Sequence, residues 1–382
     1  MIHNSGTYIR TVIAGEHVQA FVPNRLPPSD PSLNTADFEQ ANRDAELALA
    51  QLNGLSGLVP SVEWLVYGAI RKEALLTSQI EGTQATLIDL FDEEAELGAA
   101  NADDVAEVVN YLHAFRLAQK HLRSPKGLPI SIRLLCDVHR LLLRGARGAN
   151  KQSGEVRRSQ NWIGGTRPGN AVFVPPPANR LAALLSDLEH YIHAERANLP
   201  PLVRIGLIHV QFETIHPFLD GNGRIGRLLI GALLEAWGLL QEPLLYISVF
   251  FKRHQLEYYR LLSRVRTDGD WEPWTGFFLE GVKTASAEAA RSIVAVATQI
   301  NNDRKKVLAS SSQSPAAYRL FELLPSMPRF TVERARAAMR TSFPTANAAI
   351  KALVELDIVS ETTGRAKNRS FGYAKYIKLL YE

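Results

Sequence analysis

Apolar residues recur at intervals of three and four along most of the chain, which is the period of helices that bury one face. The pattern predicts helices over about residues 35–53, 60–80, 84–97, 103–123, 131–144, 178–197, 201–215, 223–240, 252–267 and 271–300. Ser131 and the stretch Asn101–Asp104 supply N-cap residues in front of two of them. The first thirty or so residues look extended and end in a proline-rich stretch that cannot lie inside a helix. The chain is therefore expected to be mainly α-helical.

The helical period stops between Gly145 and Pro177. Inside this interval, the pattern of residues 164–175 indicates a short β-hairpin, with Pro168, Gly169 and Asn170 at its turn.

A different layout begins at about residue 316, after the polar stretch Ser310–Pro315, which is typical of a linker. Helices are expected over about 316–324, 331–340 and 345–356, followed by strand-like pieces at Ile358–Thr362 and Ser370–Tyr373 around a basic turn. This order predicts a winged helix-turn-helix. The expected division is thus 1–100, 101–300 and 313–382. In such a tail, the residues that could meet DNA phosphates or base edges are Thr345, Asn347 and Lys351 on the recognition helix and Arg365, Lys367 and Arg369 in the wing.

Charge adds to this picture. The net charge is +4, and the stretch from Arg329 to Leu380 carries ten Lys and Arg against four Asp and Glu, so the rest of the chain is slightly acidic. Such asymmetry can mark a module that faces nucleic acid. Winged helices also bind proteins, so DNA and a protein both remain open as partners of the tail.

Composition excludes other classes. The single cysteine, Cys136, rules out an internal disulfide and lies in an apolar pattern, which fits a buried thiol and a reducing cytoplasm. We see no signal peptide, and the longest apolar run, Leu228–Leu240, contains Glu235 and is too short to span a bilayer. A cytoplasmic protein without membrane contact is expected.

The most informative stretch runs from His216 to Arg227 and reads HPFLDGNGRIGR. Gly221 and Gly223 allow successive N–H groups to form a concavity, and a helix beginning near Gly223 would point its positive end there. Arg224 and Arg227, three apart, can grip phosphate oxygens. An EF-hand calcium loop is excluded by register, because positions 1 and 12 would be Phe218 and Leu229.

Two further residues complete the chemistry of this stretch. Asp220 is a carboxylate beside the anion site, where a bridging metal ion, most naturally Mg²⁺, would explain it. His216, placed in a loop by the following proline, is free to take a proton from a hydroxyl.

The twelve residues resemble the signature of the Fic family, His-Pro-Phe-x-Asp-Gly-Asn-Gly-Arg-x-x-Arg, at every fixed position. Members typically transfer AMP from ATP to a hydroxyl side chain of a target protein and release pyrophosphate. The resemblance implies His216 as general base, Asp220 as ligand of Mg²⁺ or Mn²⁺, and Phe218 as a core anchor. It further implies that Gly221, Asn222, Gly223 and Arg224 contact phosphates and that Arg227 holds the γ-phosphate.

The resemblance extends to other segments. Residues 20–28 are similar to the N-terminal region of a large Fic subgroup, and residues 154–164 with the hairpin after them are similar to the Fic flap. A flap would pair with an extended target segment by β-addition and position its hydroxyl. The residues assigned to this target-docking edge are Gly164, Gly165, Thr166, Ala171 and Val172.

A second motif lies upstream. Thr77–Gly82 ends a helical pattern and resembles the family's inhibitory motif, [Ser/Thr]-x-x-x-Glu-[Gly/Asn]. In that comparison Glu81 pairs with Arg227 and removes the arginine that should orient the γ-phosphate, while Thr77 fixes the end of the helix. Without the resemblance, Glu81 would be taken for a solvated carboxylate.

The expected protein is thus a mainly α Fic-type helical bundle with a short β-hairpin flap and a C-terminal winged helix-turn-helix. It is expected to be an autoinhibited protein adenylyltransferase that uses ATP and modifies Tyr, Thr or Ser of an unknown target, and also itself. The intact Gly221-Asn222-Gly223 favours AMP transfer over phosphate transfer. Two alternatives remain open: a DNA-binding regulator that only senses ATP, and an enzyme that mainly removes AMP. A homodimer is also left open.

Overall fold

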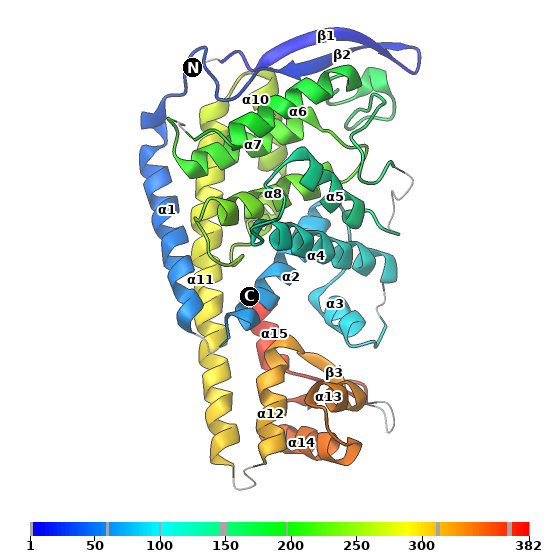
Figure 1. Ribbon diagram of the computed structural model, residues 1–382, viewed down its shortest axis with the longest axis vertical. Helices are drawn as coiled ribbons and strands as arrows, with labels where there is room; N and C mark the ends of the chain where they lie inside the picture. Colours follow the sequence, from blue (N-terminus) through cyan, green and yellow to red (C-terminus); the bar gives the residue numbers. More distant parts are fainter. Residues whose placement is uncertain are drawn as a thin grey trace.

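The computed structural model describes residues 3–58, 61–98, 101–145, 151–195, 198–310, 314–364 and 369–381. The chain is mainly α-helical, as predicted (Figure 1). The helices that precede the 145–177 interval are α1 (Glu39–Gly54), α2 (Val62–Ile80), α3 (Leu87–Glu94), α4 (Ala102–Leu122) and α5 (Ile132–Leu142). Those that follow it are α6 (Ala178–Ile192), α7 (Pro201–Ile215), α8 (Asn222–Ala236), α9 (Ser248–Arg253), α10 (Gln255–Thr267) and α11 (Trp271–Ala309).

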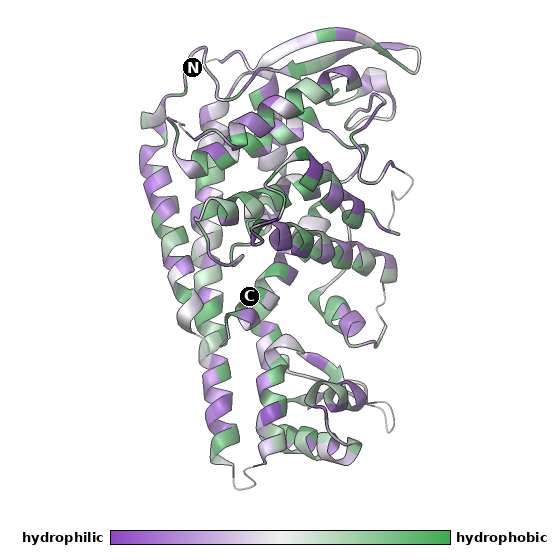
Figure 2. Ribbon diagram, viewed as in Figure 1, coloured by the Kyte–Doolittle hydropathy of each residue, from purple (hydrophilic) through white to green (hydrophobic). Residues whose placement is uncertain are grey.

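The middle of the bundle is formed by α7 and α8. Helix α7 is buried on every side, although it carries several polar residues. Helix α8 packs against α7, α4 and the end of α2. Figure 2 shows that apolar residues dominate α7 and α8, whereas the outer helix α1 mixes polar and apolar positions. This packing places the start of α8 next to the end of α2.

The longest helix, α11, joins the two ends of the molecule. It is 39 residues long, lies along α1, and continues to the C-terminal segment (Figure 1). The predicted helix ended near residue 300, whereas α11 continues to Ala309. The helix predicted over 252–267 is divided at His254 into α9 and α10.

The N-terminal stretch forms a β-hairpin, which the sequence had suggested only as extended chain. Strands β1 (Gly6–Ile13) and β2 (Glu16–Pro23) are antiparallel, with Ile13 opposite Glu16. Ala14 and Gly15 both have positive φ, 50° and 83°, which is the two-residue turn that suits the twist of a hairpin.

The segment predicted as a hairpin over 164–175 folds back on itself, but through one antiparallel bridge instead of two paired strands. Ile163 and Phe173 form a single β-bridge, and the tip is a 3₁₀ turn, η3 (Pro168–Asn170). Gly164 and Gly165 take left-handed φ values of 67° and 72°, which interrupt a strand. The tip is held instead by β2, because Glu16 accepts a hydrogen bond from the Gly169 N–H at 3.1 Å. We call residues 159–176 the flap.

The C-terminal segment has the predicted order of elements, with one short strand and one helix added, β3 (Arg329–Thr331) and α15 (Ala374–Tyr381). Strands β3 to β5 form a sheet in the order β3-β5-β4, with β5 antiparallel to both neighbours. Its elements are α12 (Pro315–Leu323), β3 (Arg329–Thr331), α13 (Val332–Met339), α14 (Phe343–Glu355), β4 (Ser360–Glu361), β5 (Ser370–Gly372) and the unpredicted α15 (Ala374–Tyr381). The winged-helix assignment stays a prediction. Helix α15 packs on α11, and its buried side chains belong to the same apolar core as the bundle.

Across the described ranges, no helix is both long and apolar enough to cross a membrane.

Candidate active site

The site is built on the loop that joins α7 to α8. Helix α7 ends at Ile215, and His216 takes a left-handed conformation with φ 50° and ψ 62°, instead of the extended one that usually precedes proline. Helix α8 starts at Asn222, with Gly221 as its N-cap at φ 77°. The Asn222 side chain fixes the loop: its Oδ1 accepts from the Phe218 N–H (2.9 Å) and its Nδ2 donates to the Phe218 carbonyl (2.8 Å).

The Asn222 side chain is therefore committed to the loop, and only its main-chain N–H can serve an anion. A helix leaves its first N–H groups without intrahelical partners, so those of Asn222, Gly223 and Arg224 are available at the start of α8. These N–H groups lie where the sequence predicts an anion cradle, and we use that name for residues 221–224.

His139 of α5 supports the loop from below, and the sequence analysis assigned it no role. Its ring stacks on Phe218 with centroids 3.9 Å apart. The Gly154 N–H donates to Nδ1 (2.9 Å), so the proton lies on Nε2, which bonds the Asp220 carbonyl (3.0 Å). Burial lowers the pKa of His139 to about 4 and keeps it neutral. In the sequence, only the place of His139 in the apolar pattern of α5 indicated that this histidine is buried.

His216 is half-buried beside two arginines. Burial, together with the charges of Arg266 and Arg157, lowers the pKa of His216 to about 3. The imidazole is therefore neutral near pH 7, which is the form that can accept a proton. Bound phosphates would add negative charge nearby and make the ring more basic.

Arg224 is directed to two carboxylates. One of its terminal nitrogens donates to Glu107 of α4 at 3.0 Å, and the other lies 3.7 Å from Asp220. Both the Arg224 and the Glu107 side chains are almost completely buried.

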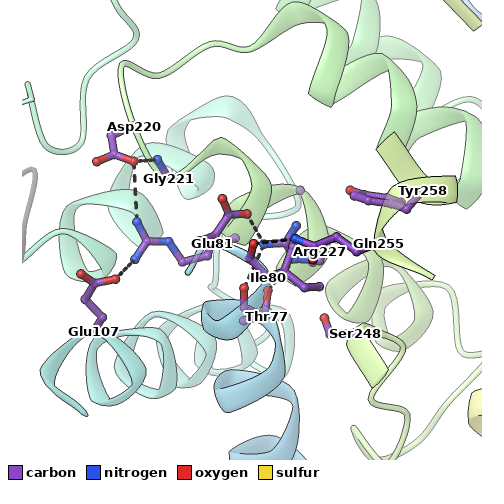
Figure 3. A network of polar contacts seen from close by, with 12 residues as sticks. Thr77, Ile80, Glu81, Glu107, Asp220, Gly221, Arg227, Ser248, Gln255 and Tyr258 are labelled. Carbon is purple, nitrogen blue, oxygen red and sulfur yellow. Dashed lines mark hydrogen bonds and ion pairs between the residues drawn. The ribbon is translucent and has the colours of Figure 1, made fainter. Parts of the chain in front are cut away.

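Arg227 is held by the end of α2. Its Nε donates to the Thr77 hydroxyl (2.6 Å), and a terminal nitrogen donates to the Thr77 carbonyl (3.1 Å) and to the Glu81 carboxylate. Thr77 and Glu81 converge on the guanidinium in Figure 3. The pairing of Glu81 with Arg227 that the resemblance implies is therefore present. Thr77 acts on Arg227 directly rather than on the helix end.

The Glu81 carboxylate also lies on the anion cradle itself. A Cβ at Gly223 would meet Glu81 Oε1 at 2.3 Å, so the oxygen rests directly against that glycine. Burial acts to lower the pKa of Arg227, but the charge and hydrogen bond of Glu81, together with nearby Tyr258 and Glu213, outweigh it and raise the pKa above its ordinary value. A carboxylate thus occupies the place where the geometry of α8 favours an anion.

The end of α2 is held from the other side by α9 and α10. Lys252 donates to the Gln79 side chain at 2.5 Å, and Gln255 donates to the Ile80 carbonyl at 3.0 Å. The Glu81 side chain itself remains about one-third exposed, at 34%. The end of α2 is therefore held on this side, whereas the Glu81 side chain is accessible from solvent.

Residues 39–120 match the family profile described as Fic/DOC family N-terminal, and residues 129–234 match the one described as Fic/DOC family. The chain belongs to the Fic/DOC family. Its site residues from His216 to Arg227 lie inside the second region, and Thr77 and Glu81 lie inside the first.

Curated relatives of this Fic protein include the proteins named protein adenylyltransferase Fic of Drosophila grimshawi and Drosophila mojavensis. Each is 28% identical over 207 residues, which is 53% of this chain and 39% and 37% of theirs. The similarity therefore spans well under half of those relatives.

Solved Fic structures share the fold. A Fic family protein from Desulfovibrio desulfuricans has a TM-score of 0.58 at 21% identity, over 90% of this chain and 97% of its own. Fic-1, residues 134–508, from C. elegans has a TM-score of 0.53 at 21% identity, over 69% of this chain and 74% of its own.

The flap of this Fic protein lies beside the motif loop. Gly164 and Gly165 form one side of its tip and Ala171 and Val172 the other, and the Thr166 N–H is bonded to the Asn170 side chain (3.0 Å). Val172 is 77% exposed.

Behind Arg227, α7 contributes a buried polar cluster. His209 bonds the Gly226 carbonyl (3.0 Å) and the Tyr258 hydroxyl (2.8 Å), so His209 and Tyr258 are core residues, as expected. Burial lowers the pKa of His209 to about 3 and raises that of Glu213 to about 7. The burial of Glu213 was not predicted, because α7 is buried on every side and has no polar face that would set its polar residues apart.

The proposed DNA contacts of the tail are only partly described. Thr345, Lys351 and Arg369 are exposed and Asn347 is half-buried, whereas Arg365 and Lys367 lie outside the described residues. Lys351 lies 3.9 Å from Glu355, so part of its charge is balanced on its own helix. Cys136, expected to be buried, is half-buried, and burial raises its pKa.

Proposed function

We propose that this Fic protein transfers AMP from ATP to a hydroxyl side chain of a target protein, and that Glu81 holds the reaction back. The observation that carries the proposal is the Glu81 carboxylate at the start of α8, against Gly223 and Arg227. A carboxylate at the N-terminus of a helix indicates a site that favours anions. The similarity to protein adenylyltransferases supports a nucleotide polyphosphate as that anion.

The phosphates are expected to bind along the first turn of α8. The N–H groups of Asn222, Gly223 and Arg224 would receive phosphate oxygens at the positive end of the helix. Arg227 would bind the terminal phosphate once Glu81 leaves it. The competition explains inhibition: with Glu81 in place, the arginine that should align the phosphate chain is already bonded.

The chemical step uses His216 as general base. Neutral His216 takes the proton of the target hydroxyl, the oxygen forms a bond to the α-phosphorus, and the bond from that phosphorus to the pyrophosphate oxygen breaks. Because its pKa is low, His216 gives up this proton readily after the step and returns to the neutral form.

A divalent cation fits beside the cradle. Asp220 has a side chain that is 43% exposed, and only its Oδ1 accepts the Gly221 N–H, at 2.6 Å, so its second oxygen can ligate a metal. No cluster of three or more His, Cys, Asp or Glu ligands occurs among the described residues. One carboxylate is sufficient for Mg²⁺, which usually keeps several waters and phosphate oxygens as ligands. When bound, the ion neutralises charge on the phosphate chain.

The target is proposed to lie along the flap. The exposed side of Val172 and the main chain around it suit an extended segment that adds to this edge. Which hydroxyl is modified depends on that partner, and self-modification is the reaction that needs no other protein.

The test is incubation with ATP labelled on the α-phosphate, for the natural chain and for Glu81→Gly. Strong labelling of the variant supports AMP transfer, and label from the γ-phosphate would indicate phosphate transfer instead. Release of AMP from a pre-labelled target by the natural chain, with no transfer by either protein, would favour the opposite activity. Binding to a DNA duplex with a steep salt dependence and no labelling would favour the ATP-sensing regulator.

A further inference from the structure

Arg157 is a buried arginine that links two parts of the site. It precedes the flap and is 2% exposed. Its Nε donates to the His216 carbonyl (2.9 Å), and its terminal nitrogens donate to the carbonyls of Ser159 (3.1 Å) and Pro176 (2.6 Å). Its main-chain N–H donates to the Pro217 carbonyl (2.9 Å).

All these acceptors are main-chain carbonyls. None of the ion pairs within the described residues includes Arg157, and burial lowers its pKa to about 10. Burying a cation without a carboxylate is costly unless its donors are satisfied, so stability alone would favour an apolar side chain here. The planar fork of arginine is suited to hold several carbonyls at fixed angles, which neither lysine nor an apolar residue can do.

The carbonyls belong to the flap and to the catalytic loop. Ser159 and Pro176 are the two ends of the flap, and His216 is the residue in left-handed conformation that carries the base. The Arg157 guanidinium therefore holds the two ends of the flap together and also bonds the His216 carbonyl.

A second arginine makes a parallel connection. The Arg266 guanidinium lies 4.0 Å from the centre of the Phe173 ring, on the flap. It also donates to the Glu213 carbonyl (3.2 Å) and the Thr214 hydroxyl (3.1 Å), in the last turn of α7 before His216. The flap is thus joined to the end of α7 at two points.

We propose that Arg157, assisted by Arg266, is a positioning residue that couples the flap to His216, so that a polypeptide docked on the flap presents its hydroxyl to the base at a fixed place. The inference rests on the proposed transferase function. The side-chain hydrogen bonds of Arg157 go to His216, Ser159 and Pro176 and not to the anion cradle. Nucleotide binding and target positioning would thus depend on different residues.

The coupling has an electrostatic consequence that simple packing lacks. The groups facing His216 are Arg266 from α10, Arg157 from the loop before the flap, and the Glu213 carbonyl from α7. Both cations disfavour the protonated imidazole, so removal of Arg157 moves the His216 pKa upward. The acid limb of the rate profile should then move to higher pH.

The experiment compares Arg157→Gln and Arg157→Lys with Arg158→Gln, all in the Glu81→Gly background. Arg158 is the matched control, because it is the next arginine but 80% exposed and bonded only to Glu155 (3.0 Å) among the described residues. Amide hydrogen exchange at Ile163, Val172 and Phe173 reports the flap, whose bridge bonds these residues make. ATP affinity, self-labelling by ATP and the pH profile of labelling are measured on the same proteins.

For Arg157→Gln we expect exchange at the flap to rise about tenfold, which corresponds to about 1.4 kcal/mol. Labelling should fall with unchanged ATP affinity, and its acid limb should move upward. Arg157→Lys should keep the natural pH profile, because the charge remains, but should still loosen the flap. Arg158→Gln should match the background.

Unchanged amide exchange at the flap in both Arg157 variants overturns the inference. It is also overturned if ATP affinity and self-labelling fall together while the pH dependence of labelling stays the same. If Arg157→Gln does not fold, the same readouts on Arg157→Lys decide. Absence of labelling in the Glu81→Gly background itself counts against the proposed transferase, while the exchange measurement still judges the coupling.

Discussion

Replacing Glu81 by glycine is the sharpest perturbation of this site. The change removes the carboxylate that lies on Gly223 and bonds Arg227, and it leaves Thr77 and the rest of α2 in place. Glu81 follows the last residue of α2, with φ −85° and ψ 1°, so glycine can adopt its backbone. Arg227 should then be free to bind the terminal phosphate of ATP, and AMP transfer should increase.

The burial of the pair sets the magnitude. Exposed ion pairs contribute about 0–1 kcal/mol, and breaking a buried one costs about 3–5 kcal/mol. The Arg227 side chain is 1% exposed and the Glu81 side chain 34%, which places this pair between the two classes, at about 2–3 kcal/mol. ATP must offset this free energy of the Glu81–Arg227 pair to reach its productive position. Transfer should therefore rise about 30- to 150-fold in the variant.

The variant should show a second signature in its stability. Without Glu81, a buried arginine loses its carboxylate, and the thermal midpoint should fall in the absence of nucleotide. ATP supplies a new anion for Arg227, so the rise in midpoint on adding ATP should be larger in the variant than in the natural chain.

The assay is self-labelling by ATP marked on the α-phosphate, with thermal unfolding measured on the same samples. Glu81→Gln separates charge from size, and Glu93→Gln is the control, because Glu93 is exposed on the neighbouring helix α3. Equal labelling by Glu81→Gly and the natural chain, with equal responses to ATP, would refute the reasoning.

Four further outcomes are expected. His216→Ala should lower transfer by about 100- to 10,000-fold and keep ATP binding, since the phosphates bind α8; retained transfer would remove His216 as the base. Asp220→Asn should raise the Mg²⁺ concentration needed for half-maximal transfer, and an unchanged metal titration would contradict its role as ligand. Thr77→Val should activate about tenfold, because it removes one hydrogen bond to a charged group, worth about 1.5 kcal/mol; labelling at the natural level would argue against this contact. The pKa of His209 is about 3 in the folded chain against 6.5 ordinarily, so below pH 6.5 only the unfolded chain gains its proton and stability falls by about 1.4 kcal/mol per pH unit. Urea unfolding between pH 6.5 and 4.5 should therefore be less pH-dependent in His209→Gln, whereas the opposite contribution of Glu213 is common to both proteins.

The helices were accessible from the sequence because each has a strong local period. Helix α7 begins and ends at the predicted residues, and Ser131 caps α5 through its hydroxyl, as expected. The division at His254 was missed because the apolar period continues through it. The length of α11 was missed because its last turns are set by packing against α12 and α15.

The flap shows where local pattern failed. The residue pattern and the Pro-Gly-Asn turn indicated a hairpin, but two glycines in left-handed conformation leave only one bridge. The tip is held by Glu16, which lies over 150 residues away in the chain. A contact of that kind leaves no mark on the local sequence.

The sequence by itself determined the chemistry of the site, because the positions that build an anion cradle are consecutive and each residue type acts locally: glycines at the turn, the start of a helix, and a histidine, an aspartate and two arginines at fixed spacing. Only the tertiary structure decided how these groups are used. It set Glu81 on Gly223 and Arg227, His139 under the loop, and Arg157 between the flap and His216. Burial and distance between remote segments govern such contacts, and both arise only when the helices pack together.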